Sequence, residues 1–319
     1  MITEDTLFIL GAGSSFPYGY PTGKELRRKI CKEFSQDYSV LLNRRASPDP
    51  DYFSEDVIQN AENFANIFFK SSTPSIDLFL SRNHNFSEIG RKAIALSIWK
   101  AETNSIFRED VDQSQDWYTY LYQRMTETLT NPDNFKLISQ NKISFITFNY
   151  DRSLEHFLYE SITNSFTSIP RTQPPNGELF PFSIQHVYGQ LAYLPWQGAH
   201  YLDYAAKLNN FDFNNIFENI KVIYDRTESD LTKTKDQILK TKKIFFLGFG
   251  FAKENLEILG IPELLTGDQE IYGTAFGMTE KEIDSVRMML SQNFKNKDPR
   301  RNNPRIINMN CYELLREYL

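Results

Sequence analysis

The sequence is poor in cysteine. Only Cys31 and Cys311 occur among its 319 residues. Two thiols are too few for a four-thiolate zinc site or for a framework of disulfides. We therefore expect no zinc or other bound metal, and a reduced, cytoplasmic setting for the protein.

The sequence also lacks a long apolar run. No stretch approaches the ~20 apolar residues that a membrane-spanning helix needs. A glycine motif begins at Gly11, so the N-terminus has no room for a basic region followed by a long apolar signal core. We expect a soluble protein that is not exported and does not enter a membrane.

A surplus of positive charge is missing as well. Lysine and arginine number 35 against 41 aspartate and glutamate residues, which gives a net charge of −6. Such a chain lacks the excess positive charge that binds phosphate backbones, so we expect no direct nucleic-acid binding.

Aromatic residues, in contrast, are abundant. With 26 Phe, 17 Tyr and 40% hydrophobic residues, the chain can build a sizeable core, which excludes disorder for most of it.

Three continuous apolar runs predict strands that are buried on both faces, as in a parallel sheet. They are Leu7–Leu10, Ile143–Phe148 and Ile244–Leu247. Helical or turn-rich sequence separates the runs, so the predicted fold class is α/β. Weaker strand candidates are Ile184–Tyr188, Lys221–Tyr224, Ile271–Phe276 and Arg305–Met309.

Strand signals disappear in a long internal segment. Amphipathic stretches at Val57–Lys70, Glu88–Thr103 and Trp117–Leu129 indicate helices there. We therefore predict a helical insertion subdomain over residues 40–135, and a main domain formed by residues 1–39 and 136–319.

Capping chemistry marks two helix starts. Thr22 with Glu25, and Thr279 with Glu282, match the capping box. In this motif the threonine hydroxyl and the glutamate carboxylate each accept a hydrogen bond from the backbone N–H of the other residue. Loops are predicted at Ser47–Pro50, Pro170–Pro181 and Lys295–Arg305.

The first predicted strand runs into Gly11-Ala12-Gly13-Ser14-Ser15. Glycines at such a place let backbone N–H groups approach an anion, while the following helical turn points its positive end outward. A phosphate site is one interpretation. A tight strand-to-helix turn is the other, because the third glycine of the dinucleotide fingerprint is missing.

Polar residues follow the second predicted strand, in the segment Thr147-Phe148-Asn149-Tyr150-Asp151. Open parallel sheets bind ligands at the carboxyl ends of their strands, so Asn149 and Asp151 are candidates for contact. Both residue types also cap helices, and a helix is expected directly after them. Contact and capping therefore remain alternatives.

A histidine and a second glycine loop are expected at the same sheet edge. Of His84, His156, His186 and His200, only His186 ends a predicted strand, and its imidazole is the leading candidate for a general base. Gly248-Phe249-Gly250 follows another strand, with Asn255 shortly after. Convergence of both loops with Asn149 and His186 predicts a binding site.

Taken in order, these motifs resemble the sirtuin-like family over most of the chain. The segment Phe8–Gly23 is similar to the opening of bacterial antiphage NADases. The resemblance implies a Rossmann-like sheet with an inserted module, and NAD as the ligand. The residues that it implies for NAD binding are Gly11, Ala12, Gly13, Ser14, Ser15, Thr147, Gly248, Phe249, Gly250 and Asn255.

The resemblance also implies roles at the reacting end. Asn149 would orient water or ribose, Asp151 would hold the nicotinamide side, and His186 would act as the base. In the family a glycine usually follows the histidine directly, whereas Val187 and Tyr188 separate His186 from Gly189 here.

The expected activity is hydrolysis of NAD to nicotinamide and ADP-ribose, with NAD consumed as substrate. Depletion of NAD would stop an infected cell, and a partner protein or homo-oligomerisation would switch the enzyme on. The alternatives are a non-catalytic module that binds NAD or ADP-ribose, a deacylase or ADP-ribosyltransferase, and a nuclease. Deacylation is disfavoured, because the family's deacylases carry four zinc-binding cysteines.

Overall fold

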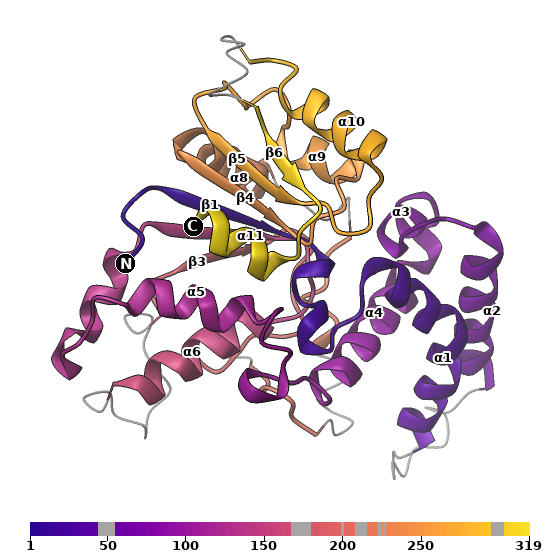
Figure 1. Cartoon of the computed structure of the whole chain (residues 1–319). Coiled ribbons are helices and arrows are strands. Elements are labelled where there is room, and N and C mark those ends of the chain that lie inside the picture. The colour runs from indigo at the N-terminus through magenta and orange to yellow at the C-terminus, as the bar shows by residue number, and fades with distance from the viewer. Residues whose placement is uncertain are drawn as a thin grey trace.

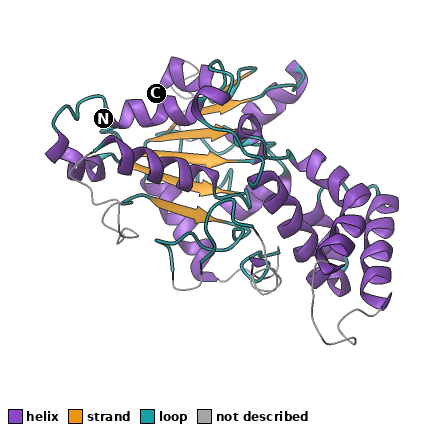
Figure 2. Ribbon diagram, turned by 90° about the horizontal axis from the view of Figure 1, so that it is seen from below, coloured by secondary structure: helices purple, strands orange, loops and turns teal. Residues whose placement is uncertain are grey.

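The computed structural model of the chain describes residues 1–43, 55–166, 180–198, 201–207, 216–222, 225, 228–294 and 303–319. Its centre is one six-stranded sheet in which all strand pairs are parallel, flanked by helices (Figures 1 and 2). The α/β class and the parallel sheet are thereby confirmed. No helix in the described ranges combines the length and the apolar character that crossing a bilayer requires.

The strand order is β3-β2-β1-β4-β5-β6. This is the order of doubly wound, Rossmann-like sheets, in which chain direction along the sheet reverses between β1 and β4 and leaves a crevice at their carboxyl ends. The strands are β1 (Thr6–Leu10), β2 (Ile143–Thr147), β3 (Ser183–His186), β4 (Lys243–Leu247), β5 (Glu270–Thr274) and β6 (Arg305–Ile307).

Six of the seven predicted strands are therefore present. The prediction at Lys221–Tyr224 is wrong for its two described residues, 221 and 222, which form no strand. The Lys221 N–H instead donates to the Tyr188 carbonyl, next to an isolated bridge between Gly189 and Ile220. This segment is held to the loop after β3 rather than to the sheet.

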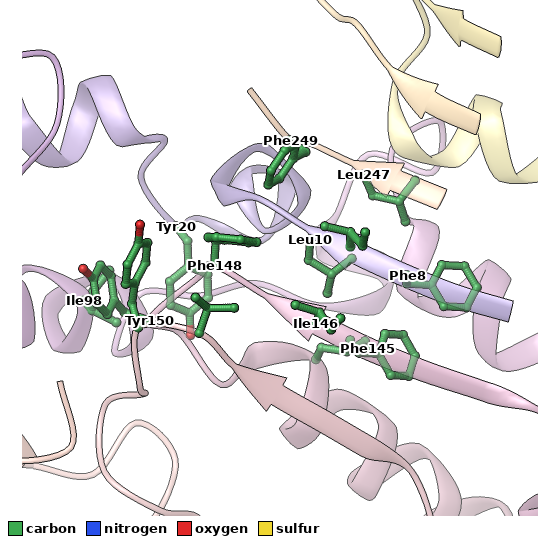
Figure 3. Close-up of a cluster of buried hydrophobic side chains, with 14 of the residues drawn as sticks. Phe8, Leu10, Tyr20, Ile98, Phe145, Ile146, Phe148, Tyr150, Leu247 and Phe249 are labelled. Carbon is green, nitrogen blue, oxygen red and sulfur yellow. The ribbon is translucent and has the colours of Figure 1, made fainter. Parts of the chain in front are cut away.

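An aromatic ladder crosses the middle of the sheet. Phe8 stacks on Phe145 of one neighbouring strand and on Phe245 of the other, with ring centroids 5.2 and 5.5 Å apart. Phe245 in turn stacks on Tyr272 at 5.0 Å. These residues are partners in the strand register, and such pairs add about 0.5–1.5 kcal/mol each beyond their buried area. Figure 3 shows Phe8 against Phe145.

Seven of the described helices fall into two groups. Helices α1 to α4 pack on one another at the side of the sheet where the strands end, and α5 packs against α6 and α11 along the sheet (Figure 1). The bounds are α1 (Gly23–Asn43), α2 (Glu55–Ser71), α3 (Ile76–Arg82), α4 (Ser87–Glu102), α5 (Trp117–Thr126), α6 (Ser153–Ser165), α8 (Glu228–Lys240), α9 (Lys253–Leu259), α10 (Glu280–Leu290) and α11 (Cys311–Tyr318).

Local chemistry explains these helices. Thr22 and Glu25 exchange the hydrogen bonds of a capping box before α1, and Thr279 and Glu282 do so before α10, as predicted.

The three predicted amphipathic helices are present as α2, α4 and α5. Their apolar faces form core: Phe64 and Phe68 of α2, for example, are fully buried. The predicted loops at 47–50 and most of those at 170–181 and 295–305 lie outside the described residues.

Candidate active site

A cavity of about 380 Å³ lies beyond the carboxyl ends of β1, β2 and β4. This is the crevice that the strand order creates, and its size falls within the usual range for ligand sites. One side, which we call the strand-end wall, is formed by Gly11–Gly13, Ser15, Phe148–Asp151, Tyr188, Gly248–Gly250, Ala252, Glu254 and Asn255. The other side, the helical wall, is formed by Tyr20–Gly23, Leu26, Ser75–Leu78 and Ile98.

Most of the predicted site residues meet in this cavity. Figure 3 shows Phe148, Tyr150, Tyr20 and Ile98 gathered beyond the end of β2. Ser14, Thr147 and His186 are not part of the wall, and His200 lies outside the described residues. The predicted residues that do line the cavity are Gly11, Ala12, Gly13, Ser15, Asn149, Asp151, Gly248, Phe249, Gly250 and Asn255.

The two glycine loops touch each other, which explains three of their glycines. A Cβ on Gly11 would lie 2.6 Å from the Gly248 carbonyl oxygen, and one on Gly13 would lie 2.9 Å from the Gly248 Cα. Gly248 itself has a φ of +57°, and a Cβ there would lie 2.0 Å from the Ser14 nitrogen. Close backbone approach therefore requires glycine at these positions, with or without a ligand.

The backbone donors of the first glycine loop are largely engaged. The N–H groups of Gly11 and Gly13 donate to the carbonyls of Leu247 and Gly248, and that of Ser14 donates to the Gly11 carbonyl. These three N–H groups do not face a phosphate. The observation favours the tight-turn interpretation for this part of the motif.

Asn149 is held by a serine pair. Its Nδ2 donates to Ser14 Oγ and Ser15 Oγ, both at 3.2 Å. The hydroxyls can only accept there, because Ser14 Oγ donates to the Gly11 carbonyl and Ser15 Oγ donates to Asp151. The amide orientation is thereby determined.

The other end of this amide is unpaired. Asn149 is 7% exposed, and no described residue donates a hydrogen bond to its Oδ1. Buried amide oxygens are normally hydrogen-bonded, and an unsatisfied one costs about 1–3 kcal/mol. A ligand hydroxyl, amide or water that donates to Oδ1 would remove this cost.

Asp151 does cap the following helix. Its Oδ1 accepts from the N–H and the hydroxyl of Ser153, and its Oδ2 accepts from Ser15 Oγ at 2.8 Å. Burial raises the pKa of the Asp151 carboxyl, against the hydrogen bonds from Ser153 and Ser15, which lower it. Asp151 also lines the cavity, so its capping role does not exclude contact with a ligand.

His186 is engaged at both ring nitrogens. Nδ1 lies 3.0 Å from the Asn149 carbonyl oxygen and Nε2 lies 2.5 Å from Glu155 Oε1. Burial lowers the pKa of His186, but the Glu155 carboxylate, the Asn149 carbonyl and the Asp151 carboxylate together raise it, so that the pKa lies above its ordinary value. Each ring nitrogen faces an acceptor oxygen of the protein, an arrangement that suits a ring donating from both, so neither nitrogen is turned toward a ligand in the cavity.

Two tyrosines that the sequence analysis did not single out also belong to the site. The Tyr150 hydroxyl donates to Asp77 Oδ1 from α3, and the Tyr188 hydroxyl donates to Asn255 Oδ1 at 2.8 Å. Tyr150 lies inside the motif after β2, and Tyr188 directly precedes Gly189, so each had a signal nearby. Asp77 had none, because only the packing of α3 brings it to the cavity.

The charge in the cavity has one sign. Asp77, Asp151 and Glu254 are part of the wall, whereas no lysine or arginine is found among the described residues that form it. Five aromatic side chains add apolar surface: Tyr20, Phe148, Tyr150, Tyr188 and Phe249. Carboxylates and aromatic faces both favour a cationic or electron-poor group in a ligand.

Fold and cavity define the chain as a Rossmann-like α/β protein with a candidate ligand site at its topological switch point. A scan against protein-family models finds no match, and a search of the curated proteins gives none either.

Proposed function

We propose that the protein is an NAD glycohydrolase that cleaves NAD to nicotinamide and ADP-ribose. The observation that carries the proposal is Asn149, an oriented amide that lines a cavity at the dinucleotide position of the fold and whose buried oxygen has no partner among the described residues. The motif resemblance to sirtuin-like NADases supports the same substrate.

The reaction begins with loss of nicotinamide. The bond between the ribose C1 and the pyridinium nitrogen breaks, and its electron pair stays with nicotinamide, which becomes neutral. Positive charge then develops on the ribose as in other glycosidic cleavages. The carboxylates of Asp77 and Asp151 in the wall stabilise that charge electrostatically.

Water completes the reaction. Asn149 Oδ1 accepts a hydrogen bond from the water or from a ribose hydroxyl, and thereby directs the water oxygen to C1. The new C–O bond forms, and one proton of the water is released to the Asp151 carboxylate or to solvent. The raised pKa of Asp151 suits it to take up that proton.

His186 has a positioning role in this scheme. Its imidazolium donates to the Asn149 carbonyl and is neutralised by Glu155. The bond fixes the backbone of Asn149, as the serine pair fixes its amide. We therefore assign the residue to the support of Asn149 and not to proton transfer.

Product analysis tests the proposal. The purified chain is mixed with NAD, and nicotinamide and ADP-ribose are quantified; we expect equal amounts of the two. Asn149→Ala should lower the rate about 10²- to 10³-fold. Ser14→Ala removes one of the two partners of Asn149 Nδ2 and should cost less, whereas Thr279→Ala, far along the chain in a helix cap, serves as the control.

A non-catalytic module that binds NAD or ADP-ribose is the second candidate. The engaged ring nitrogens of His186 favour it, because no histidine base faces the cavity among the described residues. Calorimetry with NAD distinguishes the two functions. Binding with no nicotinamide release, in the parent chain and under all conditions tried, would support the module.

The biological role that we propose is defence against phage in the cytoplasm by depletion of NAD, switched on by a partner protein or by self-association. The proposal rests on the family resemblance. Light scattering with and without NAD, alongside the activity assay, tests it. A chain that stays monomeric and cleaves NAD constitutively contradicts the regulatory part.

A further inference from the structure

We propose that Ser15 is a positioning residue of this site, because its hydroxyl joins the Asn149 amide to the Asp151 carboxylate in one chain of hydrogen bonds. The inference rests on the proposed NAD hydrolysis. It assigns the proton that the attacking water loses to Asp151. It gives Ser15 the task of keeping that carboxylate in place and ionised before the reaction.

The loop after β1 fixes the direction of the Ser15 side chain. Ser15 lies between two short helical turns, and its carbonyl accepts from the Tyr18 N–H at 3.1 Å. The preceding residue, Ser14, is held at its carbonyl by the indole N–H of Trp117 at 2.7 Å. Both serines are buried, so packing and backbone bonds keep the two hydroxyls where they meet Asn149.

The two serines differ in the group to which each hydroxyl donates. Both accept from Asn149 Nδ2 at 3.2 Å. The Ser14 hydroxyl donates to the Gly11 carbonyl, whereas the Ser15 hydroxyl donates to Asp151 Oδ2, each at 2.8 Å. A serine hydroxyl has one hydrogen, so the chain from Asn149 through Ser15 has one direction and ends on the carboxylate. Ser14 supports the same amide but donates elsewhere.

The hydrogen bond from Ser15 favours the ionised form of Asp151. Burial raises the pKa of this carboxyl, the hydrogen bonds from Ser153 and Ser15 lower it, and the Glu155 carboxylate raises it. A hydrogen bond to a charged acceptor is stronger than one between neutral groups. The proposed reaction needs the ionised form, because the carboxylate stabilises positive charge on the ribose and then accepts the proton of the water.

Other titratable and charged groups surround Asp151. Burial raises the pKa values of the tyrosines among them, so these tyrosines stay neutral. Ser15→Ala removes none of these side chains, so a changed ionisation of Asp151 in that variant comes from the lost hydroxyl. The groups are Glu155 of α6 with its partner His186 of β3, Tyr118 of α5, Tyr20, Tyr204, the neighbouring Arg152 with its partner Glu102, and Asp77 and Glu254 of the cavity wall.

The test compares Ser15→Ala with Ser14→Ala over a range of pH. Each variant loses one of the two acceptors of Asn149 Nδ2. Each should therefore lower kcat/KM for nicotinamide release about 10-fold at pH values above the acidic limb of the profile. Only Ser15→Ala also loses the donor to Asp151.

The acidic limb is the reading that separates the two variants. Activity falls as pH drops through the pKa of Asp151, and loss of the Ser15 donor raises that pKa. The limb should therefore move to higher pH by about one pH unit in Ser15→Ala. In Ser14→Ala it should stay at its position in the parent, because the donor to Asp151 is intact.

Two further variants sharpen the test. Ser15→Cys keeps a weaker donor at the same place, so its acidic limb should lie between those of the parent and Ser15→Ala, and it decides the question if Ser15→Ala does not fold. Asp151→Asn has no carboxyl to titrate. Its acidic limb should be lost, and adding Ser15→Ala to it should leave the shape of the profile unchanged. Circular dichroism shows over which pH range each variant stays folded.

The outcomes separate this inference from the proposed function. If the parent releases nicotinamide but Ser15→Ala and Ser15→Cys keep the acidic limb of the parent, the role of Ser15 is overturned and NAD hydrolysis stands. The same holds if Ser14→Ala moves the limb as far as Ser15→Ala does. If the parent releases no nicotinamide, NAD hydrolysis fails and the role of Ser15 fails with it.

Discussion

The two walls of the cavity are built on different principles. The strand-end wall consists of loops that follow parallel strands, and hydrogen bonds between backbone and side chains hold its polar groups. The helical wall consists of residues on α1, α3 and α4 and of the segments just before α1 and α3, and these helices pack on one another through aromatic side chains that belong to the same core as the sheet. The comparison teaches that the strand-end wall carries most of the polar groups that the proposed reaction uses, whereas the helical wall adds Asp77 and depends on packing.

A buried ion pair joins α4, which contributes to the helical wall, to the residue that follows Asp151 of the strand-end wall. Glu102, the last residue of α4, accepts from Arg152 at 2.8 and 2.9 Å, and both side chains are fully buried. Glu102→Gln leaves the guanidinium without a counter-charge and should lower the free energy of unfolding by about 3–5 kcal/mol. Urea denaturation measures it.

Glu257→Gln is the control for that prediction. Glu257 pairs with Lys253 on the surface of α9, and breaking such a pair should change the free energy of unfolding by less than about 1 kcal/mol. Equal effects of the two substitutions would mean that the buried pair does not hold the walls together.

The bond between Tyr150 and Asp77 is a direct hydrogen bond from one wall of the cavity to the other. Tyr150→Phe and Asp77→Ala each break it, so a double-mutant cycle should give a coupling of about 1–2 kcal/mol in the free energy of unfolding. We also expect a KM for NAD raised several-fold by either change. Additive effects of the two substitutions would contradict a direct contact.

We expect the pair of His186 and Glu155 to make the stability of the protein depend on pH. The folded-state pKa of His186 is raised, so its stabilising contribution is complete below the unfolded pKa of about 6.5 and is lost as pH rises through the folded value. Parent and His186→Gln should therefore differ most at acidic pH and converge at alkaline pH. A difference that grows with rising pH would show that the ring is neutral.

The smallest effect is expected at the cap of α10. Thr279→Ala breaks the capping box with Glu282 and should cost about 1 kcal/mol of stability. Nicotinamide release should not change, because the helix does not contribute to the cavity wall in the described residues. A loss of activity in Thr279→Ala would mean that residues outside the two walls also determine the rate of nicotinamide release.

Sequence alone predicted the strand-end wall better than the helical wall. Continuous apolar runs gave the strands, and polar or glycine residues directly after them gave Asn149, Asp151 and the two glycine loops. These signals are local. Asp77 and Ile98 reach the cavity only through packing of helices that are distant in the chain, for which a single sequence carries no signal.

His186 illustrates a second limit. Its position at a strand end was predicted, but the direction of its side chain was not, because the partner Glu155 lies on another element and the turn at Gly189 depends on a contact with Asn219. Position along a strand is a local property, whereas burial and ion pairing are properties of the folded chain.

The rate of nicotinamide release at saturating NAD, compared between the parent and Asn149→Ala, tests the central claim most directly. We predict that the parent cleaves NAD and that the variant, which should still bind NAD in calorimetry, is slower by about 10²- to 10³-fold. Equal rates in two folded proteins would contradict the assignment of the unpaired Asn149 oxygen to catalysis.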